Sequence, residues 1–236
     1  MAEIKRIEKY SFSVANKIGT GAFSKVYKGL DEKTQKIVAI KVIEMATIKN
    51  QTFVNLLQNE VTVMKGLNHE NIVKLEDVYN TANNIYLVTE FCNGGDVGDI
   101  HASKKRLQES QVKTILKDIM KGLQELISKK IIHRDLKPQN FFIHNDVHKI
   151  GDFGFAKFLN SEDEVIVTTM LGTPLYMSPQ CLGKKGYSSK CDIWSLGICM
   201  YEMLTGNTPW PSNNHLELLN HMQNVSIKFP NDIVIS

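Results

Sequence analysis

Up to about Glu90, hydrophobic and polar positions alternate over short stretches, as expected for half-buried β-strands. Phe12 and Val14 follow this spacing, and Val38–Ile40 is a short apolar run typical of a buried strand. The segment Phe53–Met64 differs, because its apolar residues recur at helical spacing. The pattern therefore predicts a group of strands with one main helix among them.

Further along the chain the apolar spacing becomes mainly helical, and Ile193–Leu204 is the clearest example. Cys199 lies within this run, where packing is the expected role of its side chain. Asp192 precedes the run and is predicted to cap the helix. The change of pattern falls at residues 89–95, where the apolar strand Ile85–Val88 runs into a loop that contains two glycines. We therefore expect an α+β protein with two lobes joined at this loop.

Composition agrees with one globular unit of ordinary size. The chain has 236 residues, 42% of them hydrophobic, with no repeat and no low-complexity tract. Its net charge of +3 is too small and too dispersed to indicate a nucleic-acid partner or a membrane surface. Met1–Tyr10 lacks the apolar core of a signal peptide, and no stretch has the apolar length of a membrane span. We therefore expect cytoplasmic residence, with no nucleic acid bound and no transmembrane segment.

The four cysteines show neither the paired spacing of metal ligands nor the density of a disulfide scaffold. They are therefore expected to be free thiols. Their positions are Cys92, Cys181, Cys191 and Cys199.

The run His133–Asn140, followed by Asp152-Phe153-Gly154, carries the residue types that phosphoryl transfer needs. That reaction requires a positioned hydroxyl, a neutralised triphosphate and oxygen ligands for a metal. Asp135, Lys137 and Asn140, together with Asp152, supply two acids, a lysine and an amide. Each of these residues alone is common in a solvated loop, but the whole run with the triplet behind it is specific.

These motifs resemble those of the eukaryotic protein kinases of serine/threonine type, since H-R-D-L-x-x-x-N and D-F-G both stand intact and in the family's order. The resemblance implies a two-lobed protein-kinase-like fold. A β-rich N-lobe with one main helix would occupy residues 10–91, and a mainly helical C-lobe residues 92–236. ATP and Mg²⁺ would be the cofactors and a protein the substrate. Asp135 would orient the substrate hydroxyl and accept its proton, Lys137 would steady the γ-phosphate, and Asn140 and Asp152 would bind the metal.

Lys41 follows the apolar run Val38–Ile40, and a lysine in a buried strand is unexpected unless it has a partner. In the kinase family that partner is a helical glutamate, and Glu60 stands at the matching position of Phe53–Met64. Lys41 would then hold the α- and β-phosphates while Glu60 holds Lys41. The alternative is that Glu60 is an ordinary solvated helix residue.

The rest of the expected nucleotide site consists of small and apolar residues. The segment 19–26 matches the family's glycine-rich loop, with Gly19 and Gly21 present and Ser24 in place of the third glycine. Glycine there lets the backbone approach phosphate closely. Each apolar residue assigned to the adenine pocket could equally belong to the core. By resemblance, the pocket consists of the backbones of Glu90 and Cys92 and the side chains of Ile18, Val26, Ala39 and Phe142.

Other positions bear on the choice of substrate. Lys137 is the serine/threonine-type residue of the family, and Phe155 is a bulky residue of the kind associated with serine over threonine acceptors. Asp96 and Glu202 match acids that bind arginine in basophilic relatives, but Gln139 replaces a third. The resemblance therefore implies no strong requirement for a basic substrate.

Thr169 aligns best with the family's activating phosphosite. Arg134 and Lys157 would pair with an added phosphate and order the loop. The phosphate would come from an upstream kinase or from a second copy acting in trans. The alternative is an unmodified loop threonine. Thr173 is expected to make a structural contact to Asp135 and its neighbour Lys137.

Two departures from the family pattern concern the C-lobe. Ser178-Pro179-Gln180 replaces the usual Ala-Pro-Glu, whose glutamate pairs with an arginine near the end of the domain. The chain stops at Ser236, before the family's last helices, so the C-lobe is expected to be incomplete. We expect a fragment of a longer protein rather than a natural truncation.

Several phrases, among them Leu57-Gln58-Asn59-Glu60 and the segment 90–96, are most like the autophagy-initiating ULK branch of the family. That resemblance implies a role in autophagy initiation. Two alternatives stay open. One is a pseudokinase-like scaffold that binds nucleotide or partners without transfer, and the other is a truncated regulatory module that cannot hold its active site.

Overall fold

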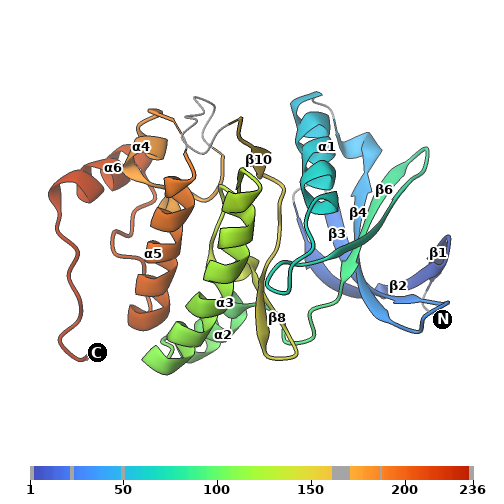
Figure 1. The fold of residues 1–236 in the computed structure, drawn as a ribbon, viewed down its shortest axis with the longest axis horizontal. Coiled ribbons are helices and arrows are strands. Elements are labelled where there is room, and N and C mark those ends of the chain that lie inside the picture. The colour runs from blue at the N-terminus through green and yellow to red at the C-terminus, as the bar shows by residue number, and fades with distance from the viewer. Residues whose placement is uncertain (1–2, 22–23, 49–50, 161–170, 187, 234–236) are drawn as a thin grey trace.

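The strands of the N-terminal part form one antiparallel sheet, at the right of Figure 1. The computed structural model describes residues 3–21, 24–48, 51–160, 171–186 and 188–233. The strand order across the sheet is β1-β2-β3-β4-β6-β5. The strands are β1 (Ile4–Ile7), β2 (Tyr10–Thr20), β3 (Ser24–Asp31), β4 (Ile37–Glu44), β5 (Leu75–Asn80) and β6 (Asn84–Glu90).

The alternation seen in the sequence gives this sheet its buried side. Tyr10, Phe12 and Tyr27 pack with Val38 and Ile40 of β4 in a small hydrophobic core. The predicted helix over Phe53–Met64 is confirmed as α1 (Gln51–Lys65), which follows the short 3₁₀-helix η1 (Met45–Thr47). The sequence did not predict β1, because its residues are mostly exposed at the sheet edge and lack a buried alternation.

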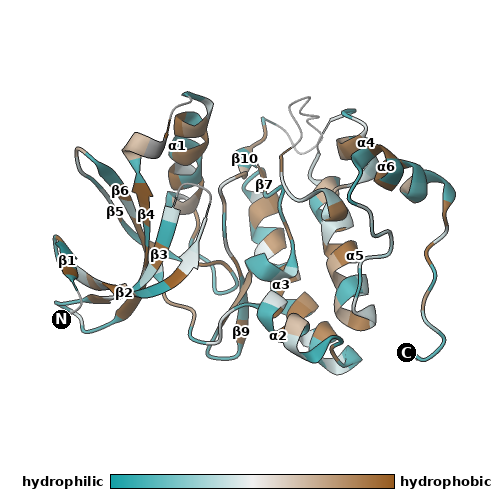
Figure 2. Cartoon of the chain, turned by 180° about the vertical axis from the view of Figure 1, so that it is seen from behind, coloured by the Kyte–Doolittle hydropathy of each residue, from teal (hydrophilic) through white to brown (hydrophobic). Residues whose placement is uncertain are grey.

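The remainder of the chain is mainly helical, which confirms the α+β class with a β-rich lobe and a helical lobe (Figure 1). Figure 2 shows brown and teal stretches along α3, as expected for a helix with one buried side. The helices are α2 (Val97–Lys104), α3 (Glu109–Ser128), α4 (Pro179–Leu182), α5 (Lys190–Thr205) and α6 (His215–Asn224). The short elements are β7 (Ile131–Ile132), η2 (Pro138–Asn140), β8 (Phe141–His144), β9 (Val147–Ile150), β10 (Lys157–Phe158) and η3 (Pro174–Tyr176).

One large hydrophobic core connects the helices and reaches α1 of the other lobe. Ile119 and Leu123 of α3 and Cys199 and Met203 of α5 are almost fully buried in it. The expected packing role of Cys199 is thereby confirmed. The elements that carry the His133–Asn140 run, from β7 to β8, lie against this core, so that run rests on a well-packed base.

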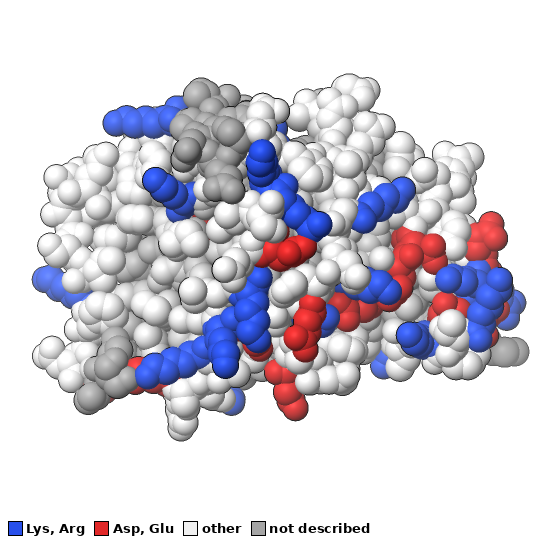
Figure 3. Space-filling model, viewed as in Figure 1, with Lys and Arg blue, Asp and Glu red and all other residues white. Residues whose placement is uncertain are grey.

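The molecular surface fits the modest net charge. In Figure 3 basic and acidic side chains lie next to one another over the central and right-hand parts of the face, whereas the left-hand part is mostly uncharged with a few basic side chains. Lys104, Lys105 and Arg106 are exposed around the end of α2. Among the described residues, no helix combines the length and apolarity needed to cross a membrane.

Two helical glycines offer a test of the packing. A Cβ atom on Gly122 of α3 would lie 2.6 Å from the carbonyl oxygen of Asn71, whereas one on Gly197 of α5 would meet nothing within 4 Å. Gly122→Ala should therefore destabilise the protein by about 1–3 kcal/mol through overpacking. Gly197→Ala is the control and should stabilise it by up to about 1 kcal/mol, because alanine is the better helix former. Urea unfolding of both variants measures the difference, and equal effects would contradict the packing around α3.

Candidate active site

Asp192 of α5 fixes the backbone of the loop between β7 and η2. Its carboxylate accepts hydrogen bonds from the backbone N–H groups of His133, at 2.7 Å, and Arg134, at 2.9 Å. The side chain is almost fully buried, and burial raises the pKa of Asp192, while the two N–H donors and the positive charge of Arg134 oppose that rise. Asp192 thus anchors the loop to α5.

The predicted helix cap at Asp192 is wrong. Helix α5 begins at Lys190 with Ser189 as its N-cap residue, so Asp192 lies in the first turn. Its carboxylate turns to the loop because two buried N–H groups there need an acceptor.

Arg134 has a backbone φ of 70°, in the left-handed region that side chains other than glycine rarely adopt. Its backbone N–H is fixed by Asp192, and its guanidinium Nε donates to the carbonyl oxygen of Phe155 at 2.5 Å. This contact connects the loop to the segment that follows Asp152-Phe153-Gly154. Two hydrogen bonds, one from the backbone and one from the side chain of Arg134, therefore hold the loop in this strained conformation.

Asp135 is buried, and its two carboxylate oxygens have different partners. Oδ1 accepts from the backbone N–H of Thr173, at 2.9 Å, and from its hydroxyl, at 2.7 Å. Oδ2 lies 2.9 Å from Lys137 Nζ and 3.2 Å from Asn140 Nδ2. Lys137 also donates to the Thr173 hydroxyl at 2.9 Å, which confirms the predicted contacts of Thr173. An acid, a lysine and an amide thus meet at one point.

Lys41 and Glu60 form the predicted pair, with 2.7 Å between Nζ and Oε1. Lys41 lies on β4 and Glu60 on α1, and the Glu60 side chain is only 7% exposed, which rules out the solvated alternative. Asp152 Oδ1 is 3.8 Å from the same Nζ. Burial alone would lower the pKa of Lys41, but attraction to Glu60 and Asp152 outweighs it and raises the pKa. Lys41 therefore keeps its positive charge at neutral pH.

Asp152 and Phe153 point in different directions. Phe153 is fully buried, with its ring centroid 5.1 Å from that of His133. His133 in turn contacts the carbonyl oxygen of Gly151 through Nε2 at 3.1 Å. Asp152 has a φ of 58° and a side chain that is 49% exposed. The buried aromatic ring thus leaves the neighbouring carboxylate free to face the space beside Lys41.

The donor set around this space suits a hard cation. Asp152 offers carboxylate oxygens and Asn140 an amide oxygen, and Mg²⁺ prefers oxygen ligands. Among the described residues there is no group of three or more histidine, cysteine or acidic side chains that could form an all-protein metal cage. That is compatible with Mg²⁺, which is usually held by one or two protein ligands together with substrate phosphates.

The residues predicted to surround the adenine lie on the adjoining strands. Gly19 of β2 is paired with Val26 of β3, and Ala39 of β4 with Thr89 of β6. Ile18 is 51% exposed, which leaves its side chain available at the sheet surface. The Gly21 N–H donates to the carbonyl oxygen of Ser24 at 2.8 Å and closes the loop between β2 and β3.

Phe142 of β8 lies half-buried directly against Gly151, on the side of the helical lobe. Cys92 is half-buried just after β6, and burial raises the pKa of its thiol to about 12. The binding of adenine by these residues stays a prediction.

Sequence reasoning missed an ion pair at the junction of the lobes. Lys149 of β9 donates to Glu90 Oε1 at 2.9 Å, and the same oxygen accepts from the backbone N–H of Lys74 at 2.8 Å. Both ionised side chains are mostly buried. The Glu90 side chain is therefore committed to the junction, and its backbone N–H also has a partner, the Lys74 carbonyl oxygen at 3.0 Å. No sequence motif connects residues 59 positions apart, so only the structure reveals this pair.

The acids considered for substrate recognition already have partners. Asp96 is the N-cap residue of α2 and accepts from the Asp99 N–H at 2.9 Å. Glu202 accepts from the Tyr176 hydroxyl at 2.7 Å. The predicted phosphosite Thr169 lies outside the described residues.

The protein kinase domain model matches residues 12–233 of this chain. The chain therefore belongs to the protein kinase family, in agreement with its two-lobed fold and with the meeting of Asp135, Lys137 and Asn140.

Within that family it is similar to serine/threonine kinases of the ULK and Atg1 type. It is 41% identical over 239 residues to the serine/threonine-protein kinase atg1 of Dictyostelium discoideum, covering 98% of this chain and 35% of that protein. It is 40% identical to the serine/threonine-protein kinase ULK1 of Homo sapiens, with 90% and 21% covered, and 37% identical to unc-51 of Caenorhabditis elegans, with 88% and 26% covered. The chain thus spans about a third or less of the length of these relatives.

Proposed function

We propose that this chain transfers the γ-phosphate of ATP to serine, and less often threonine, hydroxyls of protein substrates. The observation that carries the proposal is the environment of Asp135, whose carboxylate is buried between Lys137, Asn140 and Thr173. A carboxylate fixed in this way is suited to orient a hydroxyl and to accept its proton.

The other polar residues would neutralise and position the nucleotide. Bound Mg-ATP supplies the phosphoryl group. Lys41, held by Glu60 at 2.7 Å, would contact the α- and β-phosphates as a fixed positive charge. Lys137 would steady the γ-phosphate from the other side, and Asn140 and Asp152 would supply oxygen ligands to Mg²⁺. Gly19 and Gly21 would cover the phosphates.

Adenine would lie between the lobes, against Ile18, Val26, Ala39 and Phe142, with the backbones of Glu90 and Cys92 as its polar partners. The commitment of the Glu90 side chain to Lys149 supports the use of its backbone. In this arrangement the faces of the base are apolar and its edge is hydrogen-bonded, as in most cofactor pockets.

A role in autophagy initiation in the cytoplasm is the pathway we propose, on the strength of the similarity to the atg1 and ULK1 kinases. Phosphate on Thr169, added by an upstream kinase or by a second copy in trans, would regulate the activity. A nucleotide-binding module without transfer activity is less well supported, because Lys41, Asp135 and Asp152 are all present.

The proposal is tested by incubating the chain with γ-labelled Mg-ATP and a serine-rich protein, with threonine-only and tyrosine-only peptides alongside. We expect label on serine, less on threonine and none on tyrosine, and none with an Asp135→Asn control. Label that does not depend on Asp135 would contradict the assigned role. A thermal shift with Mg-ATP but no transfer from either protein would favour the binding module instead.

A further inference from the structure

Two cysteines that lie ten positions apart in the sequence meet inside the helical lobe. Cys181 is in α4 and Cys191 in the first turn of α5, and their Sγ atoms are 3.0 Å apart. Both residues are buried, with 2% and 3% of their surface exposed. Ser178 Oγ lies 3.0 Å from the first sulfur and 3.3 Å from the second. The pair is therefore a small polar cluster within an otherwise hydrophobic core.

A metal ion is a poor explanation for this cluster. Thiolate sites for zinc need four ligands, or three and a water. Among the described residues, no third histidine, cysteine or acidic side chain completes such a group. Asp192 follows Cys191 directly, but its carboxylate is already bound to the backbone of His133 and Arg134. The chemistry left to the two sulfurs is oxidation.

The two sulfurs have opposite tendencies to ionise. The hydrogen bond that Cys181 donates, together with the Ser178 hydroxyl and the Ser188 N–H, lowers the pKa of Cys191 despite burial. The same shared hydrogen bond, together with burial, raises the pKa of Cys181. Cys191 is therefore the sulfur that ionises first while Cys181 keeps its proton, which is the arrangement of a reactive dithiol.

The other two cysteines differ from this pair. Burial raises the pKa of Cys92 to about 12 and that of Cys199 well above its usual range. Both should stay protonated at neutral pH, and a protonated thiol is a poor nucleophile. Cys92 and Cys199 thus serve as internal controls for the oxidation of Cys181 and Cys191.

We propose that Cys181 and Cys191 are a redox-active pair that hydrogen peroxide converts to a disulfide between α4 and α5. The Cys191 thiolate attacks one peroxide oxygen, the O–O bond breaks, and with one proton the products are a sulfenic acid and water. The Cys181 sulfur then attacks the Cys191 sulfur, the S–O bond breaks, and the hydroxyl leaves as water with the proton of Cys181. In total, the two thiols lose two electrons and two protons, and one peroxide becomes two waters.

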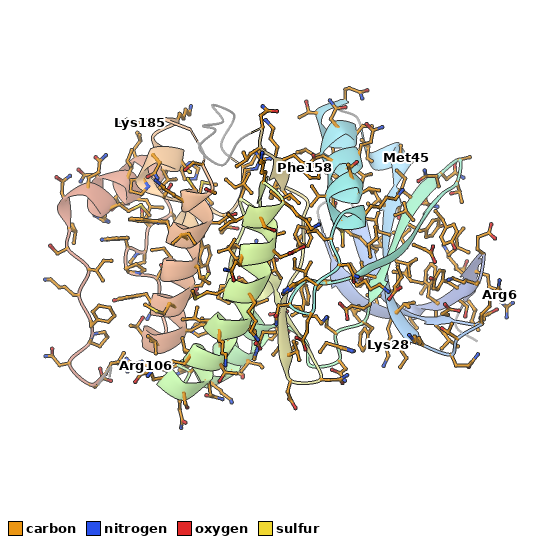
Figure 4. All side chains as sticks on the ribbon, in the orientation of Figure 1. Arg6, Lys28, Met45, Arg106, Phe158 and Lys185 are labelled. Atoms are coloured by element: carbon orange, nitrogen blue, oxygen red, sulfur yellow. The ribbon has the colours of Figure 1, made fainter. Side chains whose placement is uncertain are left out.

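Only a small movement is needed to form this bond. A disulfide has a sulfur–sulfur distance of about 2.0 Å, so the two sulfurs must approach by about 1 Å. Lys184 and Lys185 lie just after α4 and are exposed. Figure 4 shows Lys185 at the outer edge of the molecule beside α4.

A disulfide between Cys181 and Cys191 would change how the elements of the helical lobe are connected. Gln180, which stands where the family has a glutamate, approaches Cys191 Sγ only at 4.0 Å. A covalent bond next to it would fix α4 to α5. Helix α5 is already bonded to η3, because the Ser195 hydroxyl donates to the Tyr176 carbonyl oxygen at 2.8 Å. The segment after Thr173 would then be tied to the helix that carries Asp192. This inference does not depend on phosphate transfer.

The test uses the reduced chain, treated with hydrogen peroxide at neutral pH, quenched in acid, unfolded, alkylated and mapped by mass spectrometry. We expect a linked pair of peptides containing Cys181 and Cys191, lighter by two hydrogens and restored by dithiothreitol, while Cys92 and Cys199 are alkylated. The oxidation rate should rise with pH as Cys191 ionises and then level off, and it should do so at a lower pH than for an ordinary thiol, because the pKa of Cys191 is lowered.

Two variants distinguish the oxidation of Cys191 to a sulfenic acid from the formation of the disulfide. Cys181→Ser should stop at a sulfenic acid on Cys191 that dimedone traps, whereas the control Cys199→Ser should form the disulfide as the unchanged chain does. The proposal is overturned if Cys181 and Cys191 stay alkylatable at a peroxide concentration that oxidises Cys92. It is also overturned if each is oxidised without becoming linked to the other.

Discussion

Replacing Asp135 with asparagine is expected to lower phosphate transfer by at least about two orders of magnitude, the usual effect of losing a positioned general base. The substitution keeps the shape of the side chain but removes its negative charge. It also presents an NH₂ group either to Thr173, which donates twice to Oδ1, or to Lys137 and Asn140, which approach Oδ2. A mismatched buried hydrogen bond of this kind costs about 1–3 kcal/mol, so we also expect a modest loss of stability.

The measurement is the rate of transfer under saturating Mg-ATP, together with urea unfolding of the same preparations. Asp146→Asn is the matched control, because Asp146 lies exposed in the turn between β8 and β9 and its φ of 64° suits asparagine as well. The control should transfer phosphate at the normal rate. A rate within a few-fold of normal for Asp135→Asn would show that another group accepts the proton.

Replacing Lys41 with methionine is the second large effect. The side chain keeps its length and apolar stem, but the positive charge at 2.7 Å from Glu60 and 3.8 Å from Asp152 is lost. Transfer should fall by at least about two orders of magnitude, as expected when a fixed charge that neutralises phosphate is removed. Stability should fall by about 3–5 kcal/mol, because the buried Glu60 carboxylate is left without its partner.

A double variant distinguishes these two effects. Adding Glu60→Gln to Lys41→Met removes the unpaired charge, so part of the stability should return while transfer stays low. Lys113→Met is the control, because its ion pair with Glu109 is a solvated pair along α3. It should change neither property measurably. Recovery of transfer in the double variant would contradict the role assigned to Lys41.

The sequence predicted most of what depends on local pattern. The helix expected over Phe53–Met64 is α1, extended by two residues at the start and one at the end, and the apolar run Ile193–Leu204 lies within α5. The contacts of Thr173 with Asp135 and Lys137 also followed from the motifs. Periodicity succeeds for these segments because each buries one continuous face.

The features that the sequence did not predict depend on contacts between distant parts of the chain. Asp192 looked like a cap because it precedes a helical run, but its carboxylate serves two N–H groups some 58 and 59 positions away. The Glu90–Lys149 pair and the Cys181–Cys191 pair have no local signature either. Such pairs are defined only once the chain has folded, so no reading of one segment at a time could find them.

The left-handed backbone conformations of Arg134 and Asp152 affect how this protein could be made more heat-resistant by substitution. Glycine adopts a positive φ freely, so Arg134→Gly would relieve about 1 kcal/mol of backbone strain. A similar relief is available at Asp152, whose φ is 58°. At Arg134 that relief is outweighed, because glycine would also lose the hydrogen bond from the buried guanidinium to the Phe155 carbonyl oxygen. A library screened only for heat resistance would therefore favour substitution at Asp152. Directed evolution of this chain should therefore select for Mg-ATP binding as well as heat resistance in every round, because selection for stability alone would remove a residue proposed to hold the metal.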